Sequence, residues 1–363
     1  MLTDSRPARI AALRSVLAVN HLDALLLTSR SNIRYLTGFS GSAALAIVAP
    51  TDVIVITDFR YKTQVETELA GVARAVIESH SLWTRLWLVL PDVLGAERIG
   101  FESAHLLHRD FERVVENGGR WQWRPTSDLV ESLRERKDPG ELENIRSAAG
   151  IATRALSKTL PQIRAGMTEL AIAGVLEHAL RAEGSEGFPF ETIVATGARA
   201  ALPHARASAQ ATAPGDFLLL DFGAIYAGYC SDITRTVVLG AASDTQREAY
   251  GVVRAAQAHA IAGLNAGVTG KDADALARSY IERAGWGEAF GHSLGHGIGL
   301  EVHEAPRLAR TAEAPLPAGA VVTVEPGVYR PGWGGVRIED DVYLGQAGPE
   351  VLTDFPRDLM EIA

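Results

Sequence analysis

Helical and strand-like periods of apolar residues alternate through the first third of the chain. Asp4 or Ser5 can cap a helix with Pro7 in its first turn, and apolar residues then recur on one helical face at Ile10, Leu13, Val16 and Leu17. Four later apolar runs have the length and composition of strands: 24–28, 43–48, 53–57 and 98–102. Strands that alternate with helices predict an α/β domain.

The pattern changes after a charged stretch, SDLVESLRERKD (127–138), which is followed by Pro139-Gly140. We expect the boundary between two domains in this stretch, with the domains at 1–127 and 128–363.

Two long helices are predicted next, at 141–160 and at 168–183. Thr168 is suited to cap the second helix and Gly184 to end it. Short strands with glycine and proline turns follow, so the second domain is expected to be α+β.

The composition narrows the class of protein. A chain of 363 residues exceeds what one hydrophobic core usually serves, which agrees with two domains. The net charge of −9 argues against nucleic acid or an anionic membrane as the main partner. Charges interrupt the apolar residues at the start of the chain, so we expect neither a secretory signal nor a membrane span. The chain has a single cysteine, Cys230, so it cannot form an internal disulfide, which fits a reducing cytoplasm. We expect the side chain of Cys230 to pack in the interior.

Side chains of the kinds that bind metals recur through the C-terminal half, at Asp221, Asp232, His296, Glu325 and Glu339. Three of the acids follow apolar, strand-like runs, where a carboxylate carries a large desolvation cost unless it is paired or bound to a cation. Four carboxylates and one imidazole form a hard, oxygen-rich ligand set. Such a set suits two divalent ions that share bridging carboxylates.

The spacing of the two aspartates predicts that they share one face of a hairpin. A turn at 226–227 would set Asp221 opposite Asp232, and a turn at 227–228 would set it opposite Thr234. Both registers direct the two carboxylates into the same pocket.

The two glutamates are predicted to converge in the same way. The segment between Glu325 and Glu339 folds about 331–335, and a centre at Gly332 sets the glutamates directly opposite each other unless a bulge intervenes. Facing carboxylates raise one another's pKa strongly, so a site built in this way needs shared protons or metal ions.

The histidine pair nearby does not have the setting of a helical zinc motif. His292 and His296 are four residues apart, which is the helical spacing of a zinc pair. Glycines at 291, 295, 297 and 299 disfavour a helix there.

These stretches resemble the pita-bread metallopeptidases, a family that includes prolidase, aminopeptidase P and methionine aminopeptidase. The resemblance covers the whole C-terminal domain, through ALPHA (201–205), LLLDFGAIYAGYCSDITRT (218–236), GHSLGHGIGLEVHEAPR (291–307) and VEPGVYRPGWGGVRIEDDV (324–342). SNIRYLTGFSGSAALAIV (31–48) and TDFRY (57–61) resemble the creatinase-type N-terminal domain. Simple methionine aminopeptidases lack that domain, so the resemblance favours enzymes that cut next to proline.

The resemblance implies a metal-binding role for five residues. Asp221 would chelate one divalent ion, Asp232 and Glu339 would bridge two ions, and His296 with Glu325 would complete the second. Glu325 would also relay the proton of the attacking water towards the leaving nitrogen. The expected cofactors are therefore two divalent ions, with manganese expected and cobalt, zinc or iron as alternatives.

The resemblance also implies roles around the substrate. His303 would donate to the oxyanion, and His204 would meet the leaving-group side. His292 matches a family position near the substrate, although a structural histidine is the alternative for each of the three. Arg337 lies two residues before Glu339 on the same strand face and would orient the ligands. Tyr329 has the parity of Glu325, so it either lines the pocket or belongs to the core.

The expected substrate is a small peptide with an Xaa-Pro bond. Arg307 matches the arginine with which prolidases hold the C-terminal carboxylate of a dipeptide, and a bidentate arginine suits that task. It could instead form a surface salt bridge. We therefore expect an Xaa-Pro dipeptidase, with aminopeptidase P, which accepts longer peptides, as the alternative.

Two other classes of protein are weighed against this prediction. Creatinase shares both domains but hydrolyses a guanidino carbon–nitrogen bond without metal, and metal-free relatives act as binding proteins. Both lack the five-residue ligand set, which is complete here. The resemblance further implies a homodimer.

Overall fold

The structure is a computed structural model, and it describes residues 4–93 and 95–362. The chain divides into two compact units, Met1–Arg134 and Glu135–Ala363. This division lies inside the charged stretch 127–138. None of the helices in the described residues is long and apolar enough to cross a membrane.

The N-terminal unit is an α/β domain with one six-stranded sheet in the order β4-β3-β2-β1-β5-β6. The four apolar runs expected to be strands form β1, β2, β3 and β5, and the α/β class is confirmed. The strands are β1 (Ala24–Leu27), β2 (Ala44–Val48), β3 (Val53–Asp58), β4 (Arg74–Glu78), β5 (Arg98–Glu102) and β6 (Gln122–Thr126). The helices are α1 (Arg6–Val19), α2 (Arg30–Thr37), α3 (Lys62–Glu68), α4 (Leu82–Val89), α5 (His108–Asn117) and α6 (Glu131–Arg134).

The long helices of the C-terminal unit begin where the sequence supplies a capping side chain. Asp138 and Ser243 form capping boxes, and Thr168 and Thr269 each accept a hydrogen bond from a backbone N–H in the first turn. The two helices expected from the sequence are confirmed as α7 and α8. The helices are α7 (Pro139–Thr159), α8 (Glu169–Ala182), α9 (Asp244–Gly263) and α10 (Gly270–Arg283).

The strands of this unit form two sheets and two short hairpins. The four-stranded sheet has the order β19-β11-β8-β7, and the five-stranded sheet has the order β13-β12-β14-β17-β18. Their strands are β7 (Ile193–Thr196), β8 (Phe217–Phe222), β11 (Ile233–Leu239), β12 (Gly295–Gly297), β13 (Glu304–Leu308), β14 (Val321–Val324), β17 (Asp340–Gly345), β18 (Gly348–Val351) and β19 (Glu361–Ile362). The hairpins are β9 (Ile225–Tyr226) with β10 (Tyr229–Cys230), and β15 (Gly327–Arg330) with β16 (Gly334–Arg337).

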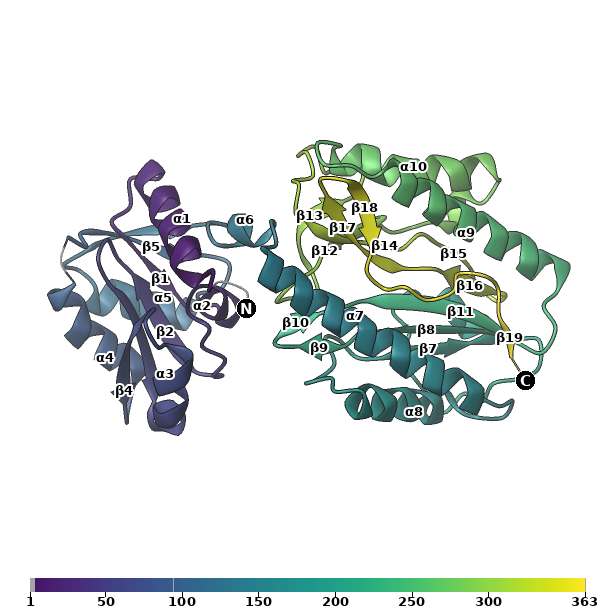
Figure 1. The fold of residues 1–363 in the computed structure, drawn as a ribbon, viewed down its shortest axis with the longest axis horizontal. Helices are drawn as coiled ribbons and strands as arrows, with labels where there is room; N and C mark the ends of the chain where they lie inside the picture. The colour runs from purple at the N-terminus through teal and green to yellow at the C-terminus, as the bar shows by residue number, and fades with distance from the viewer. Residues whose placement is uncertain (1–3, 94, 363) are drawn as a thin grey trace. The chain divides into compact units, whose positions relative to one another are not determined.

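Alternate residues of β8 pack against two different layers. Leu218 and Leu220 belong to a core shared with α7 and α8, whereas Phe217 and Leu219 belong to a core shared with α9, α10 and the five-stranded sheet. Figure 1 shows α8 on one side of the sheets and α9 with α10 on the other. Asp221 has the parity of Leu219, so it points to the side of the five-stranded sheet.

Candidate metal centre

The first hairpin directs both aspartates to one face. β8 and β11 pair antiparallel with Asp221 opposite Thr234, which is the second of the two expected registers. The chain turns at Ala227 and Gly228, whose φ angles of 46° and 76° are both positive, as a type I′ turn requires. Asp232 and Thr234 share their parity on β11, so Asp232 faces the same side as Asp221.

The second hairpin sets the glutamates opposite each other. Val324 pairs with Asp340 on one side of them, and Gly327 pairs with Arg337 on the other. The register is the same in both ladders and is centred on Gly332, as expected. Glu325 and Glu339 therefore occupy facing positions where the five-stranded sheet passes into the β15–β16 hairpin.

His296 enters the site from a short strand that can approach β14 only through glycine. A Cβ atom on Gly295 would lie 1.9 Å from the carbonyl oxygen of Thr323. The backbone N–H of His296 donates to Thr323 Oγ1 at 3.1 Å, and its Nδ1 lies 3.0 Å from Gly297 O. Because a carbonyl only accepts, Nδ1 carries the proton, and Nε2 is left with a free lone pair.

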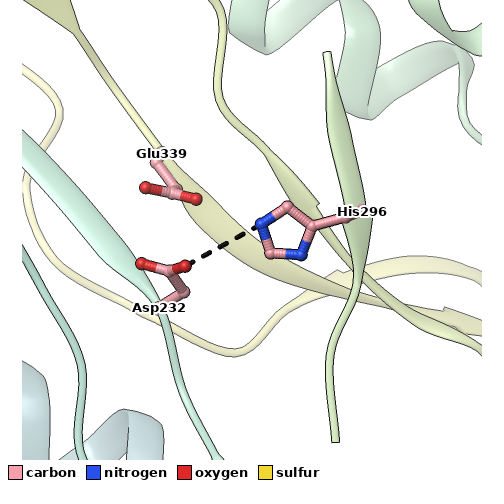
Figure 2. A group of neighbouring side chains, drawn as sticks. All are labelled: Asp232, His296 and Glu339. Atoms are coloured by element: carbon pink, nitrogen blue, oxygen red, sulfur yellow. Dashed lines mark ion pairs between the residues drawn. The ribbon is translucent and has the colours of Figure 1, made fainter. Parts of the chain in front are cut away.

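Three of the five expected ligands form a compact cluster. Asp232, His296 and Glu339 each offer a ligand atom, and these atoms all lie within 4.8 Å of one another. Figure 2 shows the imidazole pointing at the two carboxylates, with Nε2 3.9 Å from Asp232 Oδ2. The same nitrogen lies 3.5 Å from Glu325 Oε1. Asp221 is outside this group of atoms, and its carboxylate pairs with Arg337.

The acids share one buried, negative environment. Burial raises the pKa of Asp232 well above its usual value, and Glu339 and Asp221 raise it further. Burial also raises the pKa of Glu339 well above its usual value, and it raises the pKa of Glu325 to about 8. In the metal-free protein this environment favours the protonated form of Asp232, Glu325 and Glu339.

The donor set fits a divalent cation. Asp221 Oδ1 and Asp232 Oδ1 are buried, and neither has a hydrogen-bond donor among the described residues. A buried carboxylate oxygen without a donor is costly, and a cation supplies the missing partner. Carboxylate oxygens with one imidazole nitrogen are ligands that divalent metals accept.

Arg337 and Thr234 connect the carboxylates of Asp221 and Glu339 through hydrogen bonds. Arg337 Nη2 donates to Asp221 Oδ2, and its Nε donates to Thr234 Oγ1 at 3.1 Å. The Thr234 hydroxyl in turn donates to Glu339 Oε2 at 2.5 Å. Arg337 is thus hydrogen-bonded directly to one expected ligand, Asp221, and through Thr234 to another, Glu339.

Tyr329 and His292 continue this network. Arg337 Nη1 donates to the Tyr329 hydroxyl at 2.7 Å, which leaves that hydroxyl to donate to His292 Nε2 at 2.9 Å. His292 Nδ1 lies 2.8 Å from Ser293 O. Both ring nitrogens of His292 are therefore engaged, and burial lowers its pKa to about 4. Tyr329 packs in the core, and its hydroxyl takes part in this polar network.

The remaining expected residues, His204, His303 and Arg307, are exposed. His303 packs its ring 4.4 Å from the ring of His296. Partial burial of the ring lowers the pKa of His303, and His204 lowers it further. Arg307 on β13 pairs with His296 on β12.

Two threonines are the residues that the sequence interpretation missed. Thr234 holds Glu339, and the Thr323 hydroxyl lies 3.3 Å from Glu325 Oε1. Both are fully buried. Their parity was available from the sequence, because Thr234 follows Asp232 by two residues and Thr323 precedes Glu325 by two.

Comparisons with known proteins agree with this arrangement. Residues 143–346 match the metallopeptidase family M24, and residues 9–136 match the creatinase/prolidase N-terminal domain. The chain belongs to the metallopeptidase family M24, and it is a metallopeptidase with a pita-bread catalytic unit. Enzymes of this family use divalent metal ions, in agreement with the cluster described above.

Similar proteins extend over the whole chain. The structure of an Xaa-Pro dipeptidase from Bacillus anthracis is 41% identical, with a TM-score of 0.95 over 98% of this chain and 100% of that chain. The crystal structure of an X-Pro aminopeptidase from Thermotoga maritima is 40% identical, with a TM-score of 0.91 over 97% of this chain and 99% of that chain. An Xaa-Pro dipeptidase from Pyrococcus horikoshii is 35% identical over 94% of this chain and 95% of that protein.

Proposed function

We propose that this protein is a prolidase, which hydrolyses the bond before proline in Xaa-Pro dipeptides. We propose dipeptides as the substrates because the side chain of Arg307 lacks a partner within the described part of the chain. Its side chain is exposed, and it has no ion pair or hydrogen bond among the described residues. The salt bridge weighed as the alternative role for Arg307 therefore has no partner there.

The position of Arg307 supports a contact with substrate. It pairs with His296 across β12 and β13. Burial is the main reason that the pKa values of His296 and His303 are low, and the charge of Arg307 lowers both further. An unpaired guanidinium beside the metal cluster can hold the carboxylate that a dipeptide presents directly after its scissile bond.

We further propose that the site holds two divalent ions, with manganese as the native metal. Asp221 would bind one ion, Asp232 and Glu339 would be shared, and His296 with Glu325 would complete the second set. Such ions lower the pKa of a bound water and polarise a carbonyl, so no protein nucleophile is required.

The chain's own residues would then manage protons and charge. Glu325 would pass the water's proton towards the leaving nitrogen, with its carboxylate steadied by the Thr323 hydroxyl. His303 would donate to the developing oxyanion, and His204 would contact the leaving-group side. His292 would act through Tyr329, because both of its nitrogens are already engaged.

The alternative is an aminopeptidase that accepts longer Xaa-Pro peptides. The X-Pro aminopeptidase of Thermotoga maritima is nearly as similar in sequence as the Bacillus anthracis dipeptidase, so similarity supports both specificities.

The two specificities can be distinguished through Arg307, because only a dipeptide presents a carboxylate directly after the scissile bond. We expect the wild type to prefer Xaa-Pro to Xaa-Pro-Xaa. Replacing Arg307 by Ala should weaken dipeptide hydrolysis by about 1.5–3 kcal/mol, the free energy of a hydrogen bond to a charged group, and narrow or reverse the preference. Arg310→Ala is the control, because Arg310 is exposed and its ion-pair partner is Glu282. A tripeptide preference in the wild type, or an equal loss on both substrates in Arg307→Ala, would favour the aminopeptidase.

We also propose a homodimer in a reducing, cytoplasmic setting. The resemblance to prolidases supports the dimer, and the single buried cysteine is compatible with a reducing compartment. Light scattering of the purified protein measures the first point directly.

A further inference from the structure

Glu169 is a buried acid that the proposed mechanism does not use. It is the first residue of α8, and its side chain is fully buried. A buried carboxylate persists only when donors satisfy it, so the identity of its partners shows what it holds.

The partners of Glu169 come from two segments that flank His204. On the upstream side, the Thr196 N–H donates to Oε1 at 2.9 Å, and Arg199 Nε donates to both oxygens at 3.0 Å. On the downstream side, the N–H and the hydroxyl of Ser208 donate to Oε2 at 2.9 and 2.6 Å. One carboxylate therefore ties together the two ends of a loop that has His204 between them.

Hydrogen bonds to the backbone hold the same loop, and together with the bonds of Glu169 they form what we call the clamp. Arg199 Nη2 donates to the carbonyl of Arg206 at 2.6 Å, so the arginine held by Glu169 also holds the downstream segment. The N–H of Glu169 donates to Gln210 O, and the N–H of Leu170 donates to Ser208 O. The start of α8 is thus the support of the loop.

His204 has no hydrogen bond of its own among the described residues and is exposed. Its distance to the other imidazoles is therefore set by the loop backbone. The loop packs against the β15–β16 hairpin, which carries Tyr329 and Arg337, since a Cβ atom on Gly335 would lie 2.3 Å from the carbonyl oxygen of Ala200.

We propose that Glu169 is a positioning residue that holds His204 at the leaving-group side of the metal centre. The inference rests on the proposed function, because it gives His204 a role in binding or transition-state contact. The side-chain hydrogen-bond partners of Glu169 are Thr196, Arg199 and Ser208, and none of them is an expected metal ligand. A glutamine at 169 would keep the shape but replace one acceptor oxygen by an NH₂ group, which would face donors.

Hydrogen exchange tests the clamp without any substrate. In Glu169→Gln, amides of 199–208 should exchange faster than in the wild type. Glu183→Gln is the matched control on the same helix, since Glu183 caps the other end of α8 and pairs with Lys158 and Arg154. Unchanged exchange at 199–208 in Glu169→Gln would overturn the proposal.

A double-mutant cycle tests whether Glu169 acts through His204. With the manganese-loaded enzyme and an Xaa-Pro dipeptide, Glu169→Gln should lower kcat/KM roughly ten- to hundredfold, the scale of a misplaced contact group. In the His204→Ala background the same substitution should change kcat/KM by less than about twofold. An equal loss in both backgrounds would show that Glu169 is only structural and would overturn the proposal.

A milder variant and a separate readout keep the test decisive. If Glu169→Gln does not fold, Ser208→Ala removes one donor of the clamp and should show the same coupling to His204 with a smaller loss. If the wild type cleaves no Xaa-Pro peptide, the proposed function fails, and the exchange experiment still decides whether Glu169 holds the loop.

Discussion

Removal of the Thr234 hydroxyl should weaken metal binding, whereas removal of the neighbouring Thr236 hydroxyl should lower only the stability of the fold. Thr234→Val keeps the side-chain shape but removes the group that accepts from Arg337 Nε and donates to Glu339 Oε2. Thr236→Val is the matched control. Thr236 is also fully buried, lies on the same face of β11, and exchanges two hydrogen bonds with the backbone N–H and carbonyl of Arg337.

The expected magnitudes follow from the number of groups left without partners. Each substitution leaves a buried donor and a buried acceptor each short of one partner, and an unsatisfied buried group costs about 1–3 kcal/mol. Both variants should therefore lower the free energy of unfolding of the metal-free protein by about 2–6 kcal/mol. Only Thr234→Val frees Glu339 to rotate, and loss of a group that orients a ligand lowers metal affinity about 10–100-fold.

Two measurements on each variant decide the matter. Urea denaturation of the metal-free protein gives the free energy of unfolding, and calorimetric titration with manganese gives the affinity. We expect similar unfolding losses, with weaker manganese binding only in Thr234→Val. Equal affinities in the two variants would refute the argument that the Arg337–Thr234–Glu339 chain orients the ligand.

Two further predictions concern the histidine beside the cluster and the protons within it. His303→Ala should lower kcat by about a hundredfold or more, the scale of a lost oxyanion donor. Its metal content, measured by mass spectrometry, should stay unchanged. A variant that loses metal but keeps normal turnover per remaining site would contradict the role of His303. Because the pKa of Glu325 in the metal-free protein is about 8, against an ordinary 4.5, this group stabilises the metal-free fold at low pH, and that contribution is lost as pH rises from about 4.5 to about 8. Manganese uptake at pH 7 should therefore release protons and tighten as pH rises towards 8. Calorimetric heats that do not depend on the ionisation enthalpy of the buffer would refute this.

The sequence predicted elements whose signals are local. Capped amphipathic helices and apolar central strands carry their own pattern, so α7, α8 and β1 were found near their true limits. Strand β6 was missed, because it lies at the sheet edge, contains Pro125 and has mostly exposed or half-buried side chains. Edge strands lack the apolar run that identifies a buried one.

The site was predictable where strand parity decides it and not where tertiary contacts do. The hairpin register depended on Ala227, which adopts a positive φ that a non-glycine residue rarely takes, so two turns stayed open. The engagement of His292 Nε2 depends on the hydroxyl of Tyr329, which comes from a distant strand. No spacing within the GHSLGHG motif could have revealed it.

The central claim is that turnover of Xaa-Pro peptides requires divalent metal at the Asp232–His296–Glu339 cluster. The most direct test compares initial rates on alanyl-proline and alanyl-prolyl-alanine for the native, chelator-stripped and manganese-reloaded enzyme, with metal content measured in each sample. We predict no turnover after stripping, recovery on reloading, and a higher kcat/KM for the dipeptide. Full activity in protein shown to be free of metal would contradict the account.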